Sequence, residues 1–149
     1  KEHHAVLGGE MSGHIFINHD WYGFDDAVFT AAVLSHIVAS NQISASDIIK
    51  KFPKTFSTPE LNLDVTDDVK FEMVDRFKNE MSFPSAEFNT IDGVRVTIGS
   101  AWGLMRASNT SPKLVFRFEA ETQKELEEIQ GLFLQNLNRI FPNFPINFS

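Results

Sequence analysis

The sequence predicts an α+β domain over residues 57–149, with two helices packed on one face of an antiparallel sheet. After Ser57 the patterns follow the order strand, helix, several alternating strands, helix. Residues 1–53 differ, because a long apolar helix follows two short strands, and they are predicted to be the end of a preceding α/β domain. The pattern changes between Phe52 and Ser57, where we expect the domain boundary and a hinge.

Composition sets the limits on class and partners. The chain has 149 residues, of which 42% are hydrophobic and 22% charged, and its 15 Phe indicate a well-filled core. It has no Cys, which excludes disulfides and Cys-bound metals and favours a reducing, cytoplasmic setting. A net charge of −7 argues against nucleic acid or anionic membranes as partners. We see no signal peptide and no membrane-spanning run, so an anion would have to bind at a small local site.

The first residues predict two short strands around a glycine-rich loop. Residues 5–7 read as a strand that stops at Gly8, and residues 14–17 read as a second strand. Between them, Gly8–Gly13 are expected to form a tight loop with unusual dihedral angles. A functional loop so close to the start suggests that the chain was cut from a longer protein.

Two helices should follow. Asp25 and Asp26 stand before residues 27–38, which are almost uniformly apolar, and acidic residues suit the positive end of a helix dipole. Ser44 is placed to cap a second, short helix, which Pro53 should end.

The larger domain begins with a strand and a helix. Leu61, Leu63 and Val65 alternate with polar residues, as in a half-buried strand. Helical spacing from Val69 to Phe77 then predicts a helix capped by Asp67.

A run of antiparallel strands and a final helix complete the larger domain. Asp92-Gly93 is a hairpin signal before alternating residues 94–98, and the alternation continues through Trp102 and Arg106, which places Arg106 at the end of a strand. Residues 114–120 form the next strand. Thr122 and Glu125 make a capping box. The helix behind them has an apolar stripe: Leu126, Ile129, Leu132, Phe133, Leu137 and Ile140. The tail from Phe141 should be irregular.

The glycine-rich loop carries candidate sugar ligands. Glu10, Ser12 and His14 alternate, so an extended segment would present all three on one side. A carboxylate that accepts two hydroxyls beside a hydroxyl that donates and accepts could bind a vicinal diol. The alternative is a solvated surface turn, which the residues by themselves favour.

The second candidate loop, residues 106–112, has the composition of a phosphate site. Arg106 offers a planar guanidinium, while Ser108, Asn109 and Thr110 add donors and backbone N–H groups. Arg117 lies close in sequence. The alternative is a connecting turn whose Ser, Asn and Thr side chains bond their own backbone.

Together these motifs resemble the α-D-phosphohexomutase superfamily over essentially the whole chain. Gly-Gly-Glu-Met-Ser-Gly-His at 8–14 resembles its sugar-recognition motif, and Arg-Ala-Ser-Asn-Thr-Ser-Pro at 106–112 resembles its phosphate-binding loop. Three further segments resemble the family in order and spacing: residues 23–26, 57–60 and 92–96. Met11 and Asn109 are similar to the phosphomannomutase/phosphoglucomutase branch, whereas phosphoglucosamine mutases more often have Gln and Gly there. Ser111 departs from the Thr or Glu that is often found at its position.

The resemblance implies the last part of a four-domain isomerase that moves a phosphoryl group between the 1- and 6-positions of a hexose. It implies a TATA-box-binding-protein-like last domain, with a hexose phosphate as substrate. Glu10, Ser12 and His14 would serve the sugar, and Arg106, Ser108, Asn109, Thr110 and Arg117 the phosphate that is not reacting. The phosphoserine and the Mg²⁺ loop would belong to the missing N-terminal domains, so this chain alone should be inactive. Glucose or mannose 1,6-bisphosphate would be the activator.

Other interpretations stay open. The chain could be part of a phosphoglucosamine mutase or a non-enzymatic binding module, and the net charge weighs against a nucleic-acid binder. His3 and His4 are adjacent, so on a strand they would face opposite sides and make no metal pair. No metal site is predicted here. We expect Trp102 to pack in the core rather than to stack on a sugar.

Overall fold

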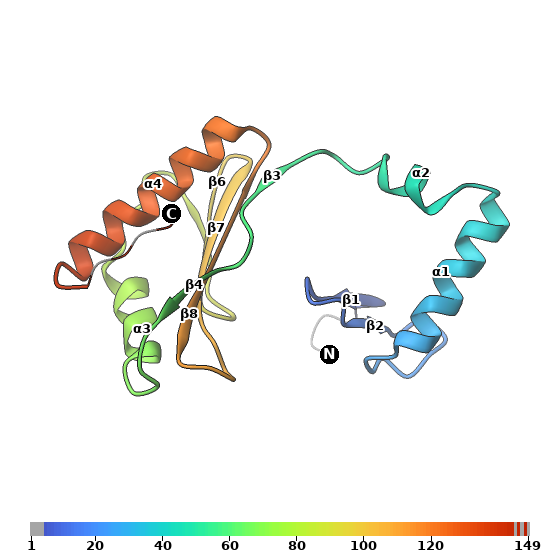
Figure 1. The fold of residues 1–149 in the computed structure, drawn as a ribbon, viewed down its shortest axis with the longest axis horizontal. Coiled ribbons are helices and arrows are strands. Elements are labelled where there is room, and N and C mark those ends of the chain that lie inside the picture. Colours follow the sequence, from blue (N-terminus) through green and yellow to red (C-terminus); the bar gives the residue numbers. More distant parts are fainter. Residues whose placement is uncertain (1–4, 145, 147, 149) are drawn as a thin grey trace. The chain divides into compact units, whose positions relative to one another are not determined.

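The computed structural model describes residues 5–144, 146 and 148, and the chain divides into two compact units, Lys1–Pro53 and Lys54–Ser149 (Figure 1). His3 and His4 lie outside the described residues. Within the described part of the chain, no helix is long and apolar enough to cross a bilayer.

The first unit opens with a small antiparallel hairpin. Strand β1 (Leu7–Gly9) pairs with β2 (Ile15–Ile17), with Leu7 opposite Ile17 and Gly9 opposite Ile15. The predicted end of the first strand at Gly8 was wrong, because both glycines belong to the strand. The predicted run of unusual dihedrals is limited to Gly13, whose φ of 91° gives the turn its left-handed residue.

Two helices complete this unit. Helix α1 (Ala27–Asn41) begins at Asp26, whose carboxylate accepts from the Phe29 N–H at 2.9 Å. This confirms Asp26 as a helix-start acid and follows from the unpaired N–H groups of a first turn. Gln42 ends the helix in a left-handed conformation, at φ 52°.

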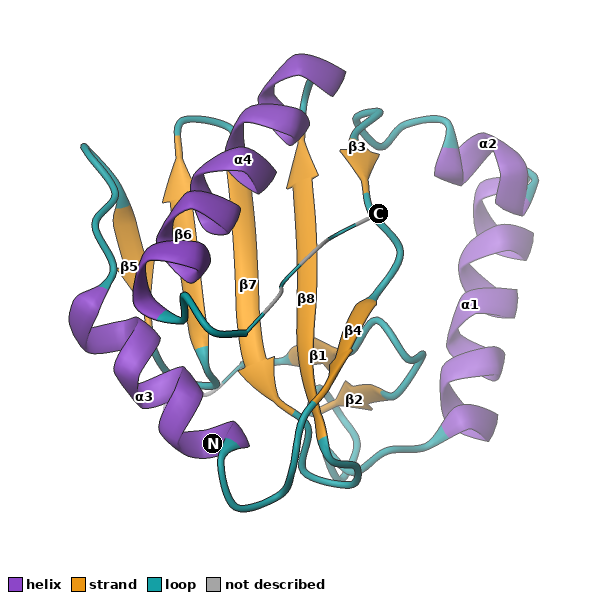
Figure 2. Ribbon diagram, turned by 60° about the vertical axis from the view of Figure 1, so that its left-hand side comes forward, coloured by secondary structure: helices purple, strands orange, loops and turns teal. Residues whose placement is uncertain are grey.

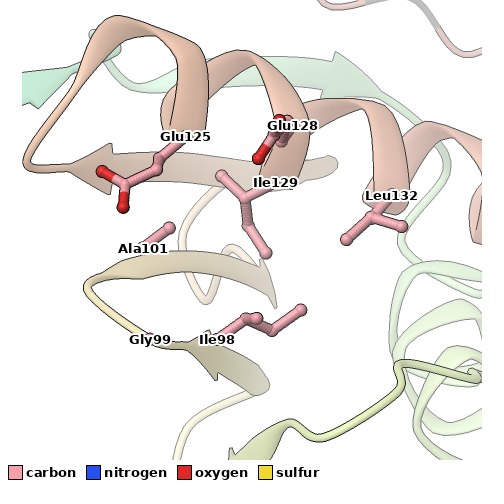
Figure 3. Close-up of a pocket in the computed structure, with 7 residues that line it drawn as sticks. All are labelled: Ile98, Gly99, Ala101, Glu125, Glu128, Ile129 and Leu132. Atoms are coloured by element: carbon pink, nitrogen blue, oxygen red, sulfur yellow. The ribbon is translucent and has the colours of Figure 1, made fainter.

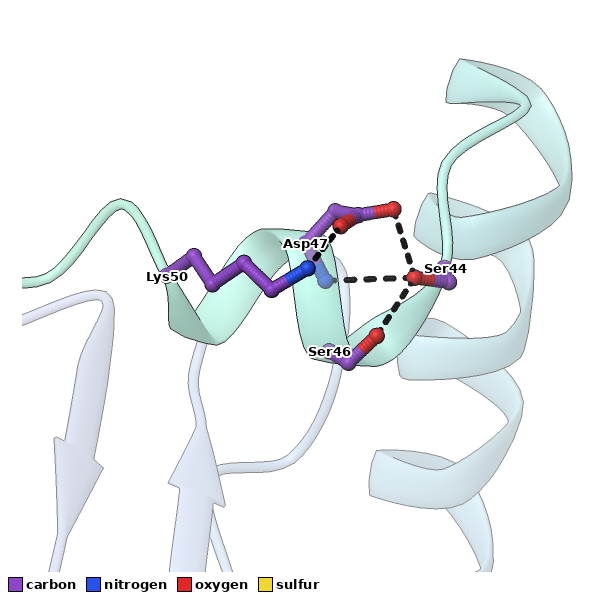
Figure 4. A network of polar contacts seen from close by, with 4 residues as sticks. All are labelled: Ser44, Ser46, Asp47 and Lys50. Carbon is purple, nitrogen blue, oxygen red and sulfur yellow. Dashed lines mark hydrogen bonds and ion pairs between the residues drawn. The ribbon is translucent and has the colours of Figure 1, made fainter.

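Helix α2 (Ala45–Ile49) is held by a polar network at its start (Figure 4). Ser44 is its N-cap, as predicted, and accepts from the Asp47 N–H, while Lys50 donates to the Asp47 carboxylate at 2.8 Å. The bonds from Lys50 and Ser44 lower the pKa of Asp47. The helix ends at Ile49, before Pro53 can act, since a proline restricts mainly the residue directly before it.

The second unit is built on one six-stranded antiparallel sheet, in the order β3-β8-β7-β6-β5, with β4 also pairing β8. Helices α3 and α4 and the sheet form two layers, with both helices on one face (Figure 2). This confirms the predicted α+β class. The elements are β3 (Phe56–Ser57), β4 (Leu61–Asp64), α3 (Lys70–Glu80), β5 (Glu87–Asn89), β6 (Val94–Ile98), β7 (Ala101–Ala107), β8 (Lys113–Ala120) and α4 (Gln123–Ile140).

The core lies between the sheet and the two helices. Phe118 of β8 meets Phe133 of α4 edge-on, with ring centroids 5.1 Å apart, and Phe133 also contacts Phe77 of α3. Gly103 leaves the space beneath these rings, because a Cβ there would lie 2.5 Å from Phe133. The predicted capping box at Thr122 and Glu125 starts α4. Phe148 of the tail also packs on Phe118.

Two expectations for this unit were wrong. Asp67 does not cap α3, because Val69 occupies the N-cap position and Asp67 pairs with Lys70 at 2.6 Å. Trp102 does not join the core, because alternation along β7 directs Gly103 and Met105 toward the helices and Trp102 toward the other face. There the Arg95 guanidinium lies 4.3 Å from the Trp102 ring centroid.

Candidate functional site: the loops at residues 8–14 and 106–112

The loop between β1 and β2 is the tight turn that was predicted, so the extended arrangement that would place Glu10, Ser12 and His14 on one side does not form. The Glu10 N–H donates to the His14 carbonyl at 2.9 Å, and the Gly13 N–H donates to the Glu10 carbonyl at 3.0 Å. The turn brings Ser12 back to Glu10, and the Ser12 hydroxyl donates to the Glu10 carboxylate at 3.1 Å. A carboxylate and a hydroxyl therefore stand together on an exposed loop, and the pair can both accept and donate hydrogen bonds.

His14 is directed to a partner that the sequence did not suggest. Its Nδ1 lies 2.5 Å from the Asp25 carboxylate, and the other Asp25 oxygen accepts from the Ile15 N–H. The hydrogen bond and the charge of Asp25 raise the pKa of His14, since both stabilise the protonated ring. Asp25, interpreted from sequence as a helix-start acid, instead orients His14.

The two candidate arginines, Arg106 on β7 and Arg117 on β8, lie on the sheet face that the helices leave open. Met105 and Ala107 are buried toward the helices, so Arg106 between them projects to the other side. Arg106 is opposite Val115 in the β7–β8 pairing, and Arg117 is opposite Leu104. The two guanidinium-bearing residues are diagonal neighbours on one face. Among the residues that the structure describes, no carboxylate lies within ion-pair distance of Arg106 or Arg117.

Ser108 organises the loop from inside. It is buried, its hydroxyl lies 2.8 Å from that of Ser111, and it accepts from the N–H groups of Thr110 at 3.4 Å and of Ser111 at 3.2 Å. This is the self-bonded turn that the sequence left open as an alternative, and it occupies backbone donors that an anion nest would use. Asn109 and Thr110 are exposed at the tip of the loop.

A surface hollow lies away from the loop at residues 106–112, between the β6–β7 turn and α4 (Figure 3). It has apolar walls from Ile98, Ile129 and Leu132 and carboxylates from Glu125 and Glu128. Because β7 begins at this turn and ends at the candidate loop, the hollow is at the opposite end of the sheet. No group of three or more His, Asp and Glu side chains that could hold a metal occurs among the described residues.

Comparisons with known proteins agree over nearly the whole chain. Residues 1–56 match the phosphoglucomutase/phosphomannomutase alpha/beta/alpha domain III, and residues 60–135 match the C-terminal domain of the same family. A phosphomannomutase/phosphoglucomutase from Pseudomonas syringae is 47% identical over 99% of this chain, and a probable phosphoglucosamine mutase from Methanopyrus kandleri is 24% identical over 93%.

A solved structure gives the same result in three dimensions. The phosphoglucomutase/phosphomannomutase family protein from Burkholderia thailandensis superposes with a TM-score of 0.83 at 40% identity, over 95% of this chain and 30% of its own. The chain spans 32% of the length of the Pseudomonas relative and 30% of that of the Methanopyrus relative. This chain therefore belongs to the phosphoglucomutase/phosphomannomutase family and corresponds to the C-terminal part of a phosphohexomutase.

Proposed function

We propose that this chain supplies the sugar-binding and phosphate-binding loops of a phosphohexomutase that interconverts hexose 1- and 6-phosphates. Residues 1–53 would be the end of the third, sugar-recognition domain and residues 57–149 the fourth, phosphate-binding domain. The two family matches and the two compact units support this division. The lack of Cys fits a reducing compartment, and we place the parent enzyme in the cytoplasm.

The observation that carries the proposal is the setting of Arg106. It is half-buried at the end of β7, on the open sheet face, with Arg117 as a diagonal neighbour and the exposed Asn109 and Thr110 next along the chain. This concentrates positive charge and polar donors at one place on a chain of net charge −7. A phosphate that does not react needs position more than chemistry, and a guanidinium fork supplies position.

The sugar loop has a matching role. Glu10 and Ser12, already joined by a hydrogen bond, would hold vicinal hydroxyls of the hexose, while Asp25 keeps His14 oriented beside them. The serine that carries the phosphoryl group would come from the missing N-terminal domains, as would the Mg²⁺ ligands. No set of three or more suitable metal ligands occurs among the described residues.

Affinity for the substrate should be weak in this chain alone. A hydrogen bond to a charged group contributes about 1.5–3 kcal/mol, whereas association costs about 4–15 kcal/mol. We expect millimolar or weaker binding of mannose 1-phosphate and glucose 1-phosphate and no turnover. An NMR titration of the ¹⁵N-labelled chain should shift the amide signals of Asn109, Thr110 and Arg106.

Variants of the arginines test whether Arg106 binds the phosphate. Arg106→Lys keeps the charge and removes the fork, so we expect an affinity about tenfold weaker. Arg76→Lys is the control: Arg76 lies on α3 and pairs with Glu80, so the substitution should leave the affinity unchanged. Absence of any shift near Arg106 with tens of millimolar sugar phosphate would refute the phosphate role and favour a non-enzymatic binding module.

A phosphoglucosamine mutase remains the alternative within the same family. The probable phosphoglucosamine mutase from Methanopyrus is the more distant relative, and Met11 and Asn109 are more similar to the phosphomannomutase/phosphoglucomutase branch. Assays of the full-length parent on glucose 1-phosphate, mannose 1-phosphate and glucosamine 1-phosphate decide between them.

A further inference from the structure

Lys70, the first residue of α3, is a lysine buried in the second unit. Its side chain is only 5% exposed, because it shares the inward stripe of the helix with Met73, Val74 and Phe77. An ammonium group removed from water is strongly destabilising unless partners replace the lost hydration. The contacts of Lys70 therefore indicate why a charge is kept at this position.

One of those contacts reaches the candidate phosphate loop. The Lys70 ammonium donates to the Ser111 carbonyl at 3.1 Å and pairs with the Asp67 carboxylate at 2.6 Å. The start of α3 and the β7–β8 connection lie at the same end of the sheet, so the helix can support the loop from the covered side (Figure 2). The exposed face of the loop remains open beside Arg106.

Ser111 is itself hydrogen-bonded to other residues of the loop. Its carbonyl also accepts from the Lys113 N–H at 2.8 Å, and its hydroxyl lies 2.8 Å from the Ser108 hydroxyl. Ser108 in turn accepts from the Thr110 N–H. A continuous set of hydrogen bonds thus runs from the buried ammonium to the tip of the loop.

We propose that Lys70 is a positioning residue of the phosphate loop, fixing Ser111 so that Asn109 and Thr110 stay in a binding geometry next to Arg106. This rests on the function proposed for the loop. Lys70 is too deeply buried to touch the phosphate, and Asp67 offsets its charge, so it acts through the backbone of Ser111. A loop held in its bound form before the ligand arrives loses less freedom on binding.

The test compares sugar-phosphate affinity with stability in the whole chain. Glucose 1-phosphate is titrated by NMR into the wild type, Lys70→Met and Lys70→Arg. Lys70→Met keeps an apolar stem and removes the donor, and it should weaken binding about five- to tenfold. Lys70→Arg keeps a cationic donor and should restore most of the affinity. In the unliganded Lys70→Met protein, shifts should concentrate at residues 108–113.

Asn136→Leu is the matched control. Asn136 is also buried in this unit, but it bonds Ser82, far from the loop in sequence and on other elements, so its loss should lower stability and leave affinity unchanged. If Lys70→Met does not fold, Lys70→Gln is used in its place. The glutamine side chain is shorter and does not reach Ser111, so the same loss of sugar-phosphate affinity is expected.

The outcomes are distinct. Equal affinity in the wild type and the folded Lys70→Met or Lys70→Gln protein overturns the role of Lys70 while leaving the phosphate loop intact. A wild type that shows no shift at Asn109 or Thr110 overturns the proposed function of the loop and the role of Lys70 with it. An affinity loss that Asn136→Leu reproduces at equal destabilisation shows that Lys70 is merely structural.

Discussion

Gly93 packs directly against the backbone of Arg106. A Cβ at Gly93 would lie 2.6 Å from the Arg106 Cβ, and the φ of Gly93 is +74°. The hairpin between β5 and β6 therefore forms a support for the residue that carries the proposed phosphate site. Only a residue without a side chain fits both the left-handed conformation and the close approach.

We therefore predict that Gly93→Ala lowers the free energy of unfolding by about 2–4 kcal/mol, from backbone strain together with overpacking. It should also weaken glucose 1-phosphate binding, because Arg106 is displaced. Urea unfolding followed by circular dichroism and the NMR titration measure the two effects. Gly99→Ala is the control: its φ is +60°, but nothing lies within 4 Å of the added Cβ, so only the strain of about 1–2 kcal/mol is expected. Equal effects of the two substitutions would contradict the close approach.

A second pair of glycines tests the core. At Gly103 an added Cβ would meet the rings of Phe133 and Phe118, whereas at Gly131 on α4 it would meet nothing within 4 Å. Gly103→Ala should destabilise the unit by about 1–3 kcal/mol, and Gly131→Ala should stabilise it by about 0.5–1 kcal/mol, because alanine favours the helix. Thermal unfolding of both variants checks this. A neutral Gly103→Ala would mean that the aromatic cluster is loosely packed.

The pair of His14 and Asp25 should make the β1–β2 hairpin sensitive to pH. The folded pKa of His14 is raised above its ordinary value of 6.5 by the hydrogen bond and charge of Asp25. The stabilisation is thus fully present below the unfolded pKa and is lost as the pH rises through the folded pKa. An NMR titration of the ring should show the raised pKa, and Asp25→Asn should bring it back down. A wild-type ring that titrates at or below 6.5 would show that the pair does not form.

The two units should differ in protection from hydrogen exchange. None of the residues of α1, all of which the structure describes, is buried, although ten of its 15 residues are apolar, and Val28 is 82% exposed. Such a helix normally has neighbours on all sides, and we expect the missing part of its domain to provide them. In this chain the α1 amides should exchange far faster than those of β7, β8 and α4. Equal protection in α1 and β8 would contradict this expectation.

Local sequence patterns were enough to predict most of the secondary-structure elements. Alternation in residues 114–120, the Thr122–Glu125 capping box, the Asp26 cap and the hairpin at Gly93 each depend on neighbours a few residues apart, so one sequence was enough to place them. Two element ends were predicted wrongly, at Gly8 and Asp67, because pairing to another strand and to Lys70 decided them.

The two candidate loops were also found by sequence, through their glycines, hydroxyls and Arg106. What the tertiary structure alone decided is where those groups point: Ser108 into the loop, His14 to Asp25, Trp102 onto the open sheet face and Lys70 under Ser111. The physical reason is that periodicity and capping act between near neighbours along the chain. Burial and buried hydrogen bonds depend on which distant segment fills the space, and Lys70 meets Ser111 across 41 residues of sequence.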